Sequence, residues 1–307
     1  MVKLLTVFGA TGQQGGALIN YILENQALFA DFSLRGVTRD ATKPAATALG
    51  GRGVDIVEAD LNIPSTLTKA VAGSHAVFAV TNFWEEASAT IEISQGKAIA
   101  DAAVAAGARQ IIWSSLPNVS EMTGGRITSM KHFDSKAEVE RYIRTLDIYS
   151  MFFMPGWFMQ NHLSIMRPRL GNDGAYVLSQ PFEPTTRLPL IDIQDTGKFI
   201  APALLDPEYY HGKRFTCATV FCNLAEMADT WTKVTGKKVR IVQAESAAEY
   251  TGLSEEQKKE VGAAGLLAEY GYYGPTGNDD LAWTLKQING KLRTWKEFVR
   301  ENEPWFL

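Results

Sequence analysis

Short apolar runs alternate with longer segments of helical periodicity through the first half of the chain. Continuous apolar runs rich in β-branched and aromatic residues predict strands at residues 4–8, 33–38, 54–58, 76–80, 110–114 and 149–154. Between these runs, helical patterns occupy residues 15–24, 45–49, 64–72, 87–106 and 133–145. Such alternation is typical of a parallel sheet that is covered by helices on both faces. We therefore predict a doubly wound α/β domain, whose ligands bind beyond the carboxyl ends of the strands.

The second half of the chain has a less regular pattern. Prolines interrupt it at positions 181, 184 and 189, and helical periodicity returns at residues 195–205, 224–235, 246–260 and 295–301. We expect residues 1–155 to form the sheet domain, joined by later segments at about residues 186–220. Residues 156–307 are expected to form a smaller, mostly helical lobe.

The composition is that of an ordinary globular protein. Of its 307 residues, 46% are apolar and 21% are charged, and the formal net charge is −4. No run of basic residues is present, which argues against direct binding to nucleic acid. The richest apolar stretch, residues 149–159, contains Pro155 and Gly156 and is shorter than the roughly 20 residues that a spanning helix needs. We therefore expect a cytoplasmic protein with no membrane or nucleic-acid partner.

Cys217 and Cys222 are the only two cysteines in the chain. Because no histidine stands at a metal-ligand spacing from them, they predict neither a disulfide framework nor a zinc site. We expect both thiols to pack inside the C-terminal lobe. His75, His162 and His211 also lack potential ligands at metal spacing, so no metal site is predicted.

A glycine-rich loop follows the first predicted strand and opens the first predicted helix: Gly9-Ala10-Thr11-Gly12-Gln13-Gln14-Gly15-Gly16. Gly9 permits a tight turn, Gly12 lets the backbone approach a pyrophosphate, and Gly15 lets the helix pack closely on the strand. The N–H groups at the start of the helix, and the positive end of its dipole, favour an anion there. A glycine motif in this position predicts a Rossmann-type dinucleotide site.

The residues after the second predicted strand select between the two pyridine dinucleotides. An acidic residue there binds the ribose 2′-hydroxyl of NAD, whereas an arginine accommodates the 2′-phosphate of NADP. Here the strand ends in Val37-Thr38-Arg39, and Lys43 follows. These two cations favour NADP(H), although Asp40 lies between them. Asp60, at the end of the third strand, either contacts the adenine amino group or caps the following helix.

The helix after the fifth predicted strand begins His132-Phe133-Asp134-Ser135-Lys136. In short-chain dehydrogenases and reductases, a tyrosine and a lysine share one helix face at this spacing. The tyrosine donates a proton, and the lysine binds the nicotinamide ribose. This chain keeps the lysine, which is expected to anchor the ribose, but has His132 in place of the tyrosine. His132 either donates the proton or has a structural or ligand-binding role, and the charge of Lys136 disfavours its imidazolium form.

Three further strand ends supply candidate site residues. Ser114 and Ser115 end the fifth strand, where either hydroxyl orients a carbonyl or simply terminates the strand. Thr81-Asn82-Phe83 follows the fourth strand, at a position suited to contacts with the ribose and pyrophosphate. Pro155-Gly156-Trp157-Phe158 follows the sixth strand and forms either the nicotinamide wall or part of the core.

Taken together, these segments resemble the NmrA-like family of atypical short-chain dehydrogenases and reductases, in particular its HSCARG-type NADP(H) redox sensors. The resemblance spans nearly the whole chain. Its segments are the glycine loop, Val37-Thr38-Arg39, Val80-Thr81-Asn82-Phe83-Trp84-Glu85, the run from His132 to Glu140, and Thr294-Trp295-Lys296-Glu297-Phe298.

The resemblance implies a Rossmann domain that binds NADP(H), together with a small C-terminal lobe. By position, the cofactor contacts of the family fall on residues 9–14, Arg39, Lys43, Asp60, Leu61, Thr81, Asn82, Phe83, Lys136 and the segment 157–161.

Two main hypotheses about function follow. The resemblance implies a sensor of the NADPH and NADP⁺ pools that regulates transcription through a protein partner, with a cofactor-dependent homodimer and a nuclear as well as a cytoplasmic location. Because other family members reduce quinones or related carbonyl compounds, the alternative is an NADPH-dependent reductase of a quinone, aldehyde or enone. In that case Lys136 holds the ribose, and His132, a serine such as Ser114, or water supplies the proton. A scaffold with a vestigial cofactor site is a third hypothesis.

Overall fold

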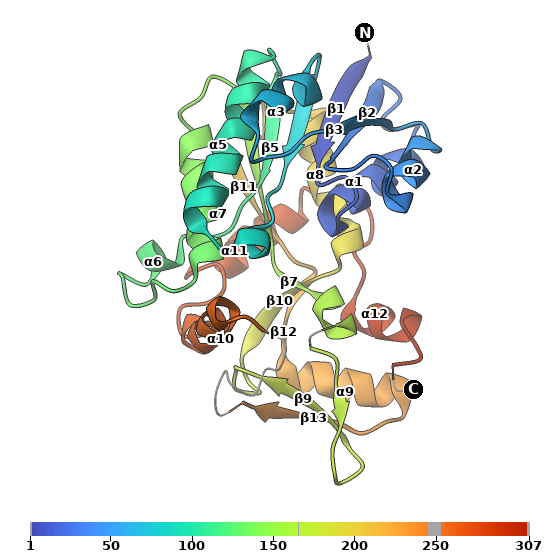
Figure 1. The fold of residues 1–307 in the computed structure, drawn as a ribbon. Coiled ribbons are helices and arrows are strands. Elements are labelled where there is room, and N and C mark those ends of the chain that lie inside the picture. Colours follow the sequence, from blue (N-terminus) through green and yellow to red (C-terminus); the bar gives the residue numbers. More distant parts are fainter. Residues whose placement is uncertain (1, 165, 245–252, 306–307) are drawn as a thin grey trace.

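The computed structural model describes residues 2–164, 166–244 and 253–305 (Figure 1). Its largest part is a seven-stranded parallel sheet with the order β11-β6-β5-β4-β1-β2-β3. The strands are β1 (Lys3–Phe8), β2 (Phe32–Thr38), β3 (Asp55–Glu58), β4 (Ala76–Ala79), β5 (Gln110–Ser114), β6 (Tyr149–Pro155) and β11 (Lys213–Cys217). The predicted α/β fold with a doubly wound parallel sheet is confirmed.

The central strands explain why the sequence pattern was clear. Every residue of β4 and β5 is buried, because each strand has a neighbour on both sides and helices above and below. A parallel strand in this position needs apolar side chains on both faces, which gives the continuous apolar runs.

Helices cover both faces of the main sheet (Figure 1). On one face α1 (Gln13–Glu24) packs against α8 (Thr196–Leu205), and Gly197 permits their close approach, since a Cβ there would lie 2.3 Å from the Cβ of Tyr21. The other face carries α3 (Pro64–Val71), α5 (Ala89–Ala105) and α7 (Lys131–Ile143). Shorter or peripheral helices are α2 (Pro44–Gly50), α4 (Phe83–Glu86), α6 (Val119–Met122), the 3₁₀ turn η2 (Ile193–Asp195) and α11 (Gly277–Leu285). Within the described residues, none of the helices has the length and apolar character to cross a bilayer.

The C-terminal part of the chain, from residue 156 onward, contains two small sheets that were not predicted from the sequence. The first, ordered β12-β10-β7, consists of β7 (Trp157–Phe158), β10 (Arg187–Ile191) and β12 (Val220–Asn223). The second, ordered β13-β9-β8, consists of β8 (Arg169–Leu170), β9 (Tyr176–Gln180) and β13 (Val239–Gln243). β7 and β8 hold only two residues each, too few for an alternation to stand out in a sequence.

Helices complete this part of the chain. They are the 3₁₀ helix η1 (Met159–Leu163), α9 (Leu224–Thr235), α10 (Glu255–Leu267) and α12 (Trp295–Glu301). The helix predicted at residues 246–260 falls partly outside the described residues, which exclude 245–252, and α10 begins at Glu255. The division of the chain into two lobes at residue 155 stays a prediction, although β11 does join the main sheet.

Cys217 does not lie where the sequence analysis expected it. It ends β11, beside Pro155 of β6, and is buried in the core of the main sheet, because the chain returns to that sheet after α8. Cys222 lies in β12 and is partly buried. Burial raises the pKa of both thiols, that of Cys222 to about 12, so neither is a reactive thiolate at neutral pH.

His162 is a buried histidine in the C-terminal core. Its ring centroid lies 5.1 Å from that of Trp295 and 5.7 Å from that of Trp231, and burial lowers its pKa from 6.5 to about 4. The unfolded chain therefore takes up a proton at higher pH than the folded protein does. The stability that the neutral ring contributes is complete above pH 6.5 and is lost as the pH falls towards 4.

We expect acidification across this window to lower the free energy of unfolding by about 3 kcal/mol more in the wild type than in His162→Gln. The glutamine does not titrate, and His75, whose pKa is also lowered, is present in both proteins. Urea unfolding at a series of pH values measures the difference. Parallel pH dependences in the two proteins would show that His162 does not contribute in this way.

Candidate functional site

The glycine loop forms a tight backbone turn between β1 and α1. Gly9 has a positive φ of 64°, and Gly12 donates its N–H to the carbonyl oxygen of Gly9 at 2.9 Å. A Cβ atom on Gly15 would lie only 2.4 Å from this same oxygen. α1 begins at Gln13, two residues earlier than predicted, and has no acidic residue in its first turn. The loop is thus a backbone cradle at the positive end of α1, which fits a pyrophosphate.

A cavity of about 620 Å³ lies beside this loop, at the carboxyl ends of β4, β5 and β6. Its other wall comes from the C-terminal part, including β9 and α10. The predicted site residues that line it are Gln13, Gln14, Thr81, Asn82, Phe83, Ser114, His132, Lys136, Pro155, Trp157 and Phe158. Those outside its lining follow β1, β2 and β3: Gly9, Thr11, Gly12, Gly15, Arg39, Lys43, Asp60 and Leu61.

Lys136 reaches the cavity from α7 and is held by a buried carboxylate. Its Nζ donates to Oε1 of Glu92, on α5, and to Oγ1 of Thr81 at 3.1 Å. The Thr81 hydroxyl donates to the same carboxylate oxygen at 2.7 Å, and the Ser135 hydroxyl donates to the other oxygen. Only 1% of the Glu92 side chain is exposed. Glu92 therefore both orients Lys136 and balances its charge.

This pairing alters the electrostatic expectation for His132. The sequence analysis assigned to Lys136 an unfavourable effect on a charged imidazole one turn away. The carboxylate of Glu92 lies directly against that ammonium group, so the pair presents little net charge to its neighbours. The objection to His132 as a proton donor is correspondingly weaker.

His132 makes its main contacts with the C-terminal part of the chain. Its Nδ1 bonds one carboxylate oxygen of Glu260, on α10, and its backbone N–H donates to the other oxygen at 3.3 Å. Trp84 and Phe83 pack against the imidazole with centroid distances of 5.1 and 5.9 Å. An ionised carboxylate only accepts hydrogen bonds, so a proton on Nδ1 satisfies this contact, and Nε2 is the ring nitrogen that remains for a ligand in the cavity.

The two serines at the end of β5 have different surroundings. Ser114 lines the cavity and donates its hydroxyl to Oε1 of Gln14 at 2.8 Å. Ser115 donates to Oε2 of the buried Glu140 on α7 at 2.6 Å and is not part of the cavity lining. Of the two hydroxyls that the sequence offered, only that of Ser114 lies where it can meet a substrate or cofactor.

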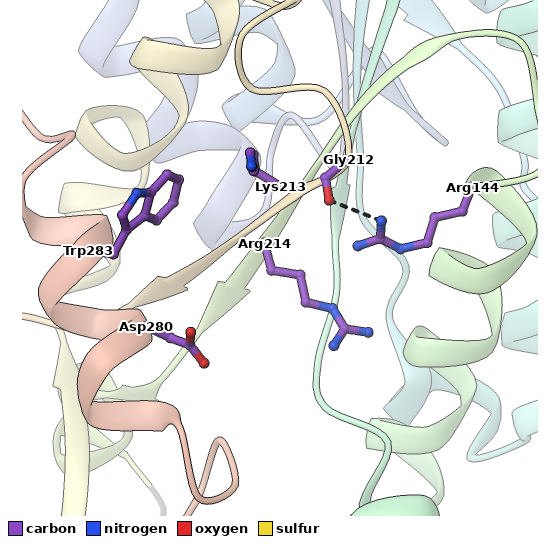
Figure 2. Close-up of a pocket in the computed structure, with 6 residues that line it drawn as sticks. All are labelled: Arg144, Gly212, Lys213, Arg214, Asp280 and Trp283. Carbon is purple, nitrogen blue, oxygen red and sulfur yellow. Dashed lines mark hydrogen bonds between the residues drawn. The ribbon is translucent and has the colours of Figure 1, made fainter.

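Glu140 also binds two arginines at a second, shallow pocket beside β11. Its Oε1 accepts from Nη2 of Arg144 at 2.8 Å and from Nε of Arg214 at 2.6 Å. Figure 2 shows both arginines in this pocket with Lys213, Asp280 and Trp283, and Arg144 donating to the carbonyl oxygen of Gly212. Since one buried carboxylate engages both guanidinium groups, the cluster joins α7 to β11 and has a structural role.

Arg39 and Lys43 follow β2, where the NADP(H) prediction needs a cation. Arg39 forms an ion pair with Glu85 of α4 and keeps 62% of its side chain exposed. Asp40 is engaged by Thr42, whose hydroxyl and N–H donate to it at 2.6 and 2.9 Å and lower its pKa. Arg39 is therefore accessible to a 2′-phosphate, which would compete with Glu85.

Asp60 does not cap the helix that follows it. α3 begins at Pro64 with Ile63 at its N-cap, and the Asp60 carboxylate instead accepts the N–H of Asn62 at 2.8 Å. The capping alternative was wrong because a turn of the chain separates Asp60 from the helix, and proline favours the first helical position. The contact of Asp60 with adenine stays a prediction.

The segment after β6 forms one wall of the cavity. Trp157 and Phe158 make up β7, which pairs with Leu190 and Ile191 of β10. Gly156 allows this approach, since a Cβ there would lie 2.2 Å from the carbonyl oxygen of Pro189. Both aromatic side chains are half-buried and line the cavity, which favours the cavity-wall interpretation over a purely internal position.

Comparison with known proteins identifies the family. The sequence pattern of the NmrA-like family matches residues 1–299. The chain belongs to the NmrA-like family. One curated relative is the NmrA-like family domain-containing oxidoreductase lnaB of Aspergillus flavus. It is 31% identical over 310 residues, and the match covers 94% of this chain and 91% of the relative's length. This relative is named an oxidoreductase and not a redox sensor, so the family is confirmed but the narrower resemblance to HSCARG-type sensors is not.

Solved structures share the fold of this NmrA-like protein. NmrA, described as a negative transcriptional regulator, superposes with a TM-score of 0.86 at 23% identity, covering 99% of this chain and 96% of its own. It has been solved with NAD and with NADP. The triphenylmethane reductase of Citrobacter sp., solved with NADP(H), superposes with a TM-score of 0.76 at 21% identity. The match covers 97% of this chain and 99% of the reductase chain.

The sequence analysis of this NmrA-like chain missed the two carboxylates that organise the cavity, Glu92 and Glu260. Glu92 had a recognisable signal, because helical spacing places it on the buried face of α5 with Gln95, Gly96 and Ile99. A charged residue on such a face needs a partner. Glu260 had no comparable signal, since its partner lies 128 residues away along the chain.

Proposed function

We propose that this NmrA-like protein is an NADPH-dependent oxidoreductase that reduces a small carbonyl compound, quinone or enone. One observation carries the proposal: Lys136 and His132, both potential hydrogen-bond donors to a ligand, line one cavity and are each held by a separate buried carboxylate. A site with paired titratable groups in a cleft is a candidate for chemistry. The oxidoreductase names of the curated fungal relatives support the same conclusion.

The residues present fit a dinucleotide. The backbone cradle of Gly9, Gly12 and Gly15 and the start of α1 would hold the pyrophosphate, and Arg39 and Lys43 the 2′-phosphate. Further contacts would come from Asp60, Leu61, Thr81, Asn82 and Phe83, with Trp157 and Phe158 beside the nicotinamide. Lys136, already oriented by Glu92, would bind the nicotinamide ribose. When bound, NADPH supplies the hydride.

His132 is the proposed proton donor to the developing oxyanion of the substrate. Its Nε2 is the ring nitrogen left free by Glu260. Ser114, also in the cavity lining, would orient the carbonyl by turning its hydroxyl from Gln14 to the carbonyl oxygen. Glu92 offsets the charge of Lys136, which allows His132 to carry a proton near it.

Arg39→Ala is expected to raise the dissociation constant of NADPH roughly 30-fold, because the variant loses charge-assisted hydrogen bonds to the 2′-phosphate. The affinity for NADH should stay unchanged, since NADH lacks that phosphate. Fluorescence titration of both cofactors measures this. Arg52→Ala, which removes an arginine bonded to Asn20, is the control. Equal losses of affinity for NADPH and NADH would show that Arg39 contacts a part of the cofactor other than the 2′-phosphate.

The consumption of NADPH by the purified protein, across a panel of quinones, aldehydes and enones, tests the proposed function. Turnover that depends on one class of substrate, and that weakens in His132→Gln, is the expected result. Tight NADPH binding without turnover of any compound would contradict the proposal.

A sensor of NADPH and NADP⁺ that acts through a protein partner is the second candidate. The fold shared with NmrA, a negative transcriptional regulator, favours it. We place the sensor second because a sequence identity of 23% to NmrA supports a shared fold and not a shared function. A partner protein, a homodimer and a cytoplasmic or nuclear location all stay predictions.

A further inference from the structure

We infer that Glu260 is a positioning residue that determines which nitrogen of His132 gives up a proton. The inference rests on the proposed reductase function and extends it to α10, a helix from the C-terminal part of the chain. The geometry points to a Glu260–His132 pair in which Nδ1 keeps its proton throughout and Nε2 is the ring nitrogen that donates to the substrate.

The contact is specific in its geometry. Glu260 meets His132 twice, because one carboxylate oxygen bonds the ring Nδ1 and the other accepts the backbone N–H at 3.3 Å. This double contact fixes the carboxylate relative to both the helix start and the ring. His132 is the second residue of α7, so the backbone N–H that it offers is one of those that a helix leaves unpaired at its start. Glu260 therefore accepts a hydrogen bond from the first turn of α7 and at the same time orients the imidazole.

The surroundings shield most of this pair from water. Only 7% of the Glu260 side chain and 21% of the His132 side chain are exposed. Phe133 and Trp84 lie against the imidazole with centroid distances of 4.6 and 5.1 Å. A buried carboxylate needs a partner, and here the partner is a group in the cavity wall. The ring cannot turn over without breaking the bond from Nδ1 to Glu260.

The proton balance gives Glu260 its role. Reduction of a carbonyl forms a C–H bond from the hydride of NADPH and an O–H bond from a proton, while the C=O π bond breaks. His132 starts as imidazolium, loses the proton on Nε2 to the substrate oxygen, and ends as neutral imidazole with its proton on Nδ1. Glu260 accepts that Nδ1–H in both states, and water returns a proton to Nε2 after product release.

The tautomer of His132 tests the pair without reference to activity. Nitrogen NMR of the apo protein reports which ring nitrogen carries the proton in the neutral state, and the signal is assigned by its loss in His132→Gln. We expect the Nδ1–H tautomer in the wild type and loss of this preference in Glu260→Met, an apolar replacement of similar size. An Nε2–H tautomer in the wild type would overturn the inference.

Turnover of the best substrate from the panel tests the catalytic consequence. We expect kcat to fall about 100-fold in Glu260→Met, while the dissociation constant of NADPH stays at the wild-type value. Glu260→Gln keeps an acceptor for Nδ1–H and should recover part of kcat together with the wild-type tautomer. Glu256→Gln, an exposed carboxylate one turn earlier on α10, is the matched control and should match the wild type.

The outcomes separate this inference from the proposed function. If the wild type turns over and Glu260→Met matches it in kcat, the positioning role is wrong even though the reductase is right. Equal losses of NADPH affinity and kcat in Glu260→Met would show a structural role only, and would also overturn the inference. If no substrate is reduced although His132 has the Nδ1–H tautomer, the proposed function is wrong and the pair has no catalytic use.

Discussion

Lys136→Met is expected to lower kcat/KM with NADPH about 100-fold. The methionine keeps the length of the side chain but removes the ammonium group that would hold the nicotinamide ribose, so the reacting atoms lose their alignment. Lys131→Met, an exposed position on the same helix, should leave kcat/KM unchanged. The measurement is initial-rate kinetics at varied NADPH with the best substrate from the panel.

The same substitution should also lower the free energy of unfolding by about 3 kcal/mol, because Glu92 is left as a buried charge without its cation. The double variant Lys136→Met/Glu92→Gln removes that charge and keeps one acceptor oxygen, for either the Thr81 or the Ser135 hydroxyl. We expect it to regain stability in urea unfolding but not turnover. Recovery of turnover in the double variant would show that the loss came from misfolding and that Lys136 does not act on the cofactor.

Gly15→Ala is expected to weaken NADPH binding roughly 30-fold, which corresponds to the ~2 kcal/mol cost of forcing a methyl group into a packed backbone. The new Cβ would lie 2.4 Å from the carbonyl oxygen of Gly9, so the cradle must move away from the pyrophosphate. Gly16→Ala is the matched control, since its Cβ would lie at an ordinary 3.4 Å from the carbonyl oxygen of Ala10. Titration with NADPH compares the two. Equal affinities would remove the glycine loop from the binding site.

The sheet domain could be predicted because its strands obey one simple rule. β5 was predicted at its observed bounds, and the other main strands before β11 within one residue at each end, since buried parallel strands need continuous apolar runs. β11 lacks that pattern: it sits at the edge of the sheet and begins with two exposed cations, Lys213 and Arg214. The sequence predicted only that a broad region, at about residues 186–220, returns to the sheet.

The C-terminal part was harder for a physical reason. β7 and β8 have two residues each, and their partners come from distant segments, so the pairing depends on tertiary contacts and not on local pattern. Helices with strong boundary signals were predicted correctly there. α12, for example, begins directly after Thr294, the N-cap, which forms a capping box with Glu297 in the first turn of the helix.

The residues of the cavity also form two groups, those that were predicted from the sequence and those that were not. Gln14 and Ser114 were predicted because the carboxyl ends of parallel strands always meet at one edge. Lys136 was predicted because its spacing from His132 on one helix matches the tyrosine–lysine pattern of short-chain dehydrogenases. Glu92 and Glu260 were not, because their importance comes from what their carboxylates touch. The sequence analysis judged His132 by its neighbour on the helix, Lys136, and could not see that each has its own counter-ion.

Transfer of deuterium from NADPH dideuterated at C4 to an aldehyde or enone product tests the account most directly. Wild-type protein is incubated with the labelled cofactor and the best aldehyde or enone of the panel, and the product is analysed by mass spectrometry. The account predicts one deuterium in each product molecule, transferred within the cavity that Lys136 and His132 line. Consumption of NADPH with no deuterium in the organic product would contradict it, because hydride would then not pass from cofactor to substrate in this site.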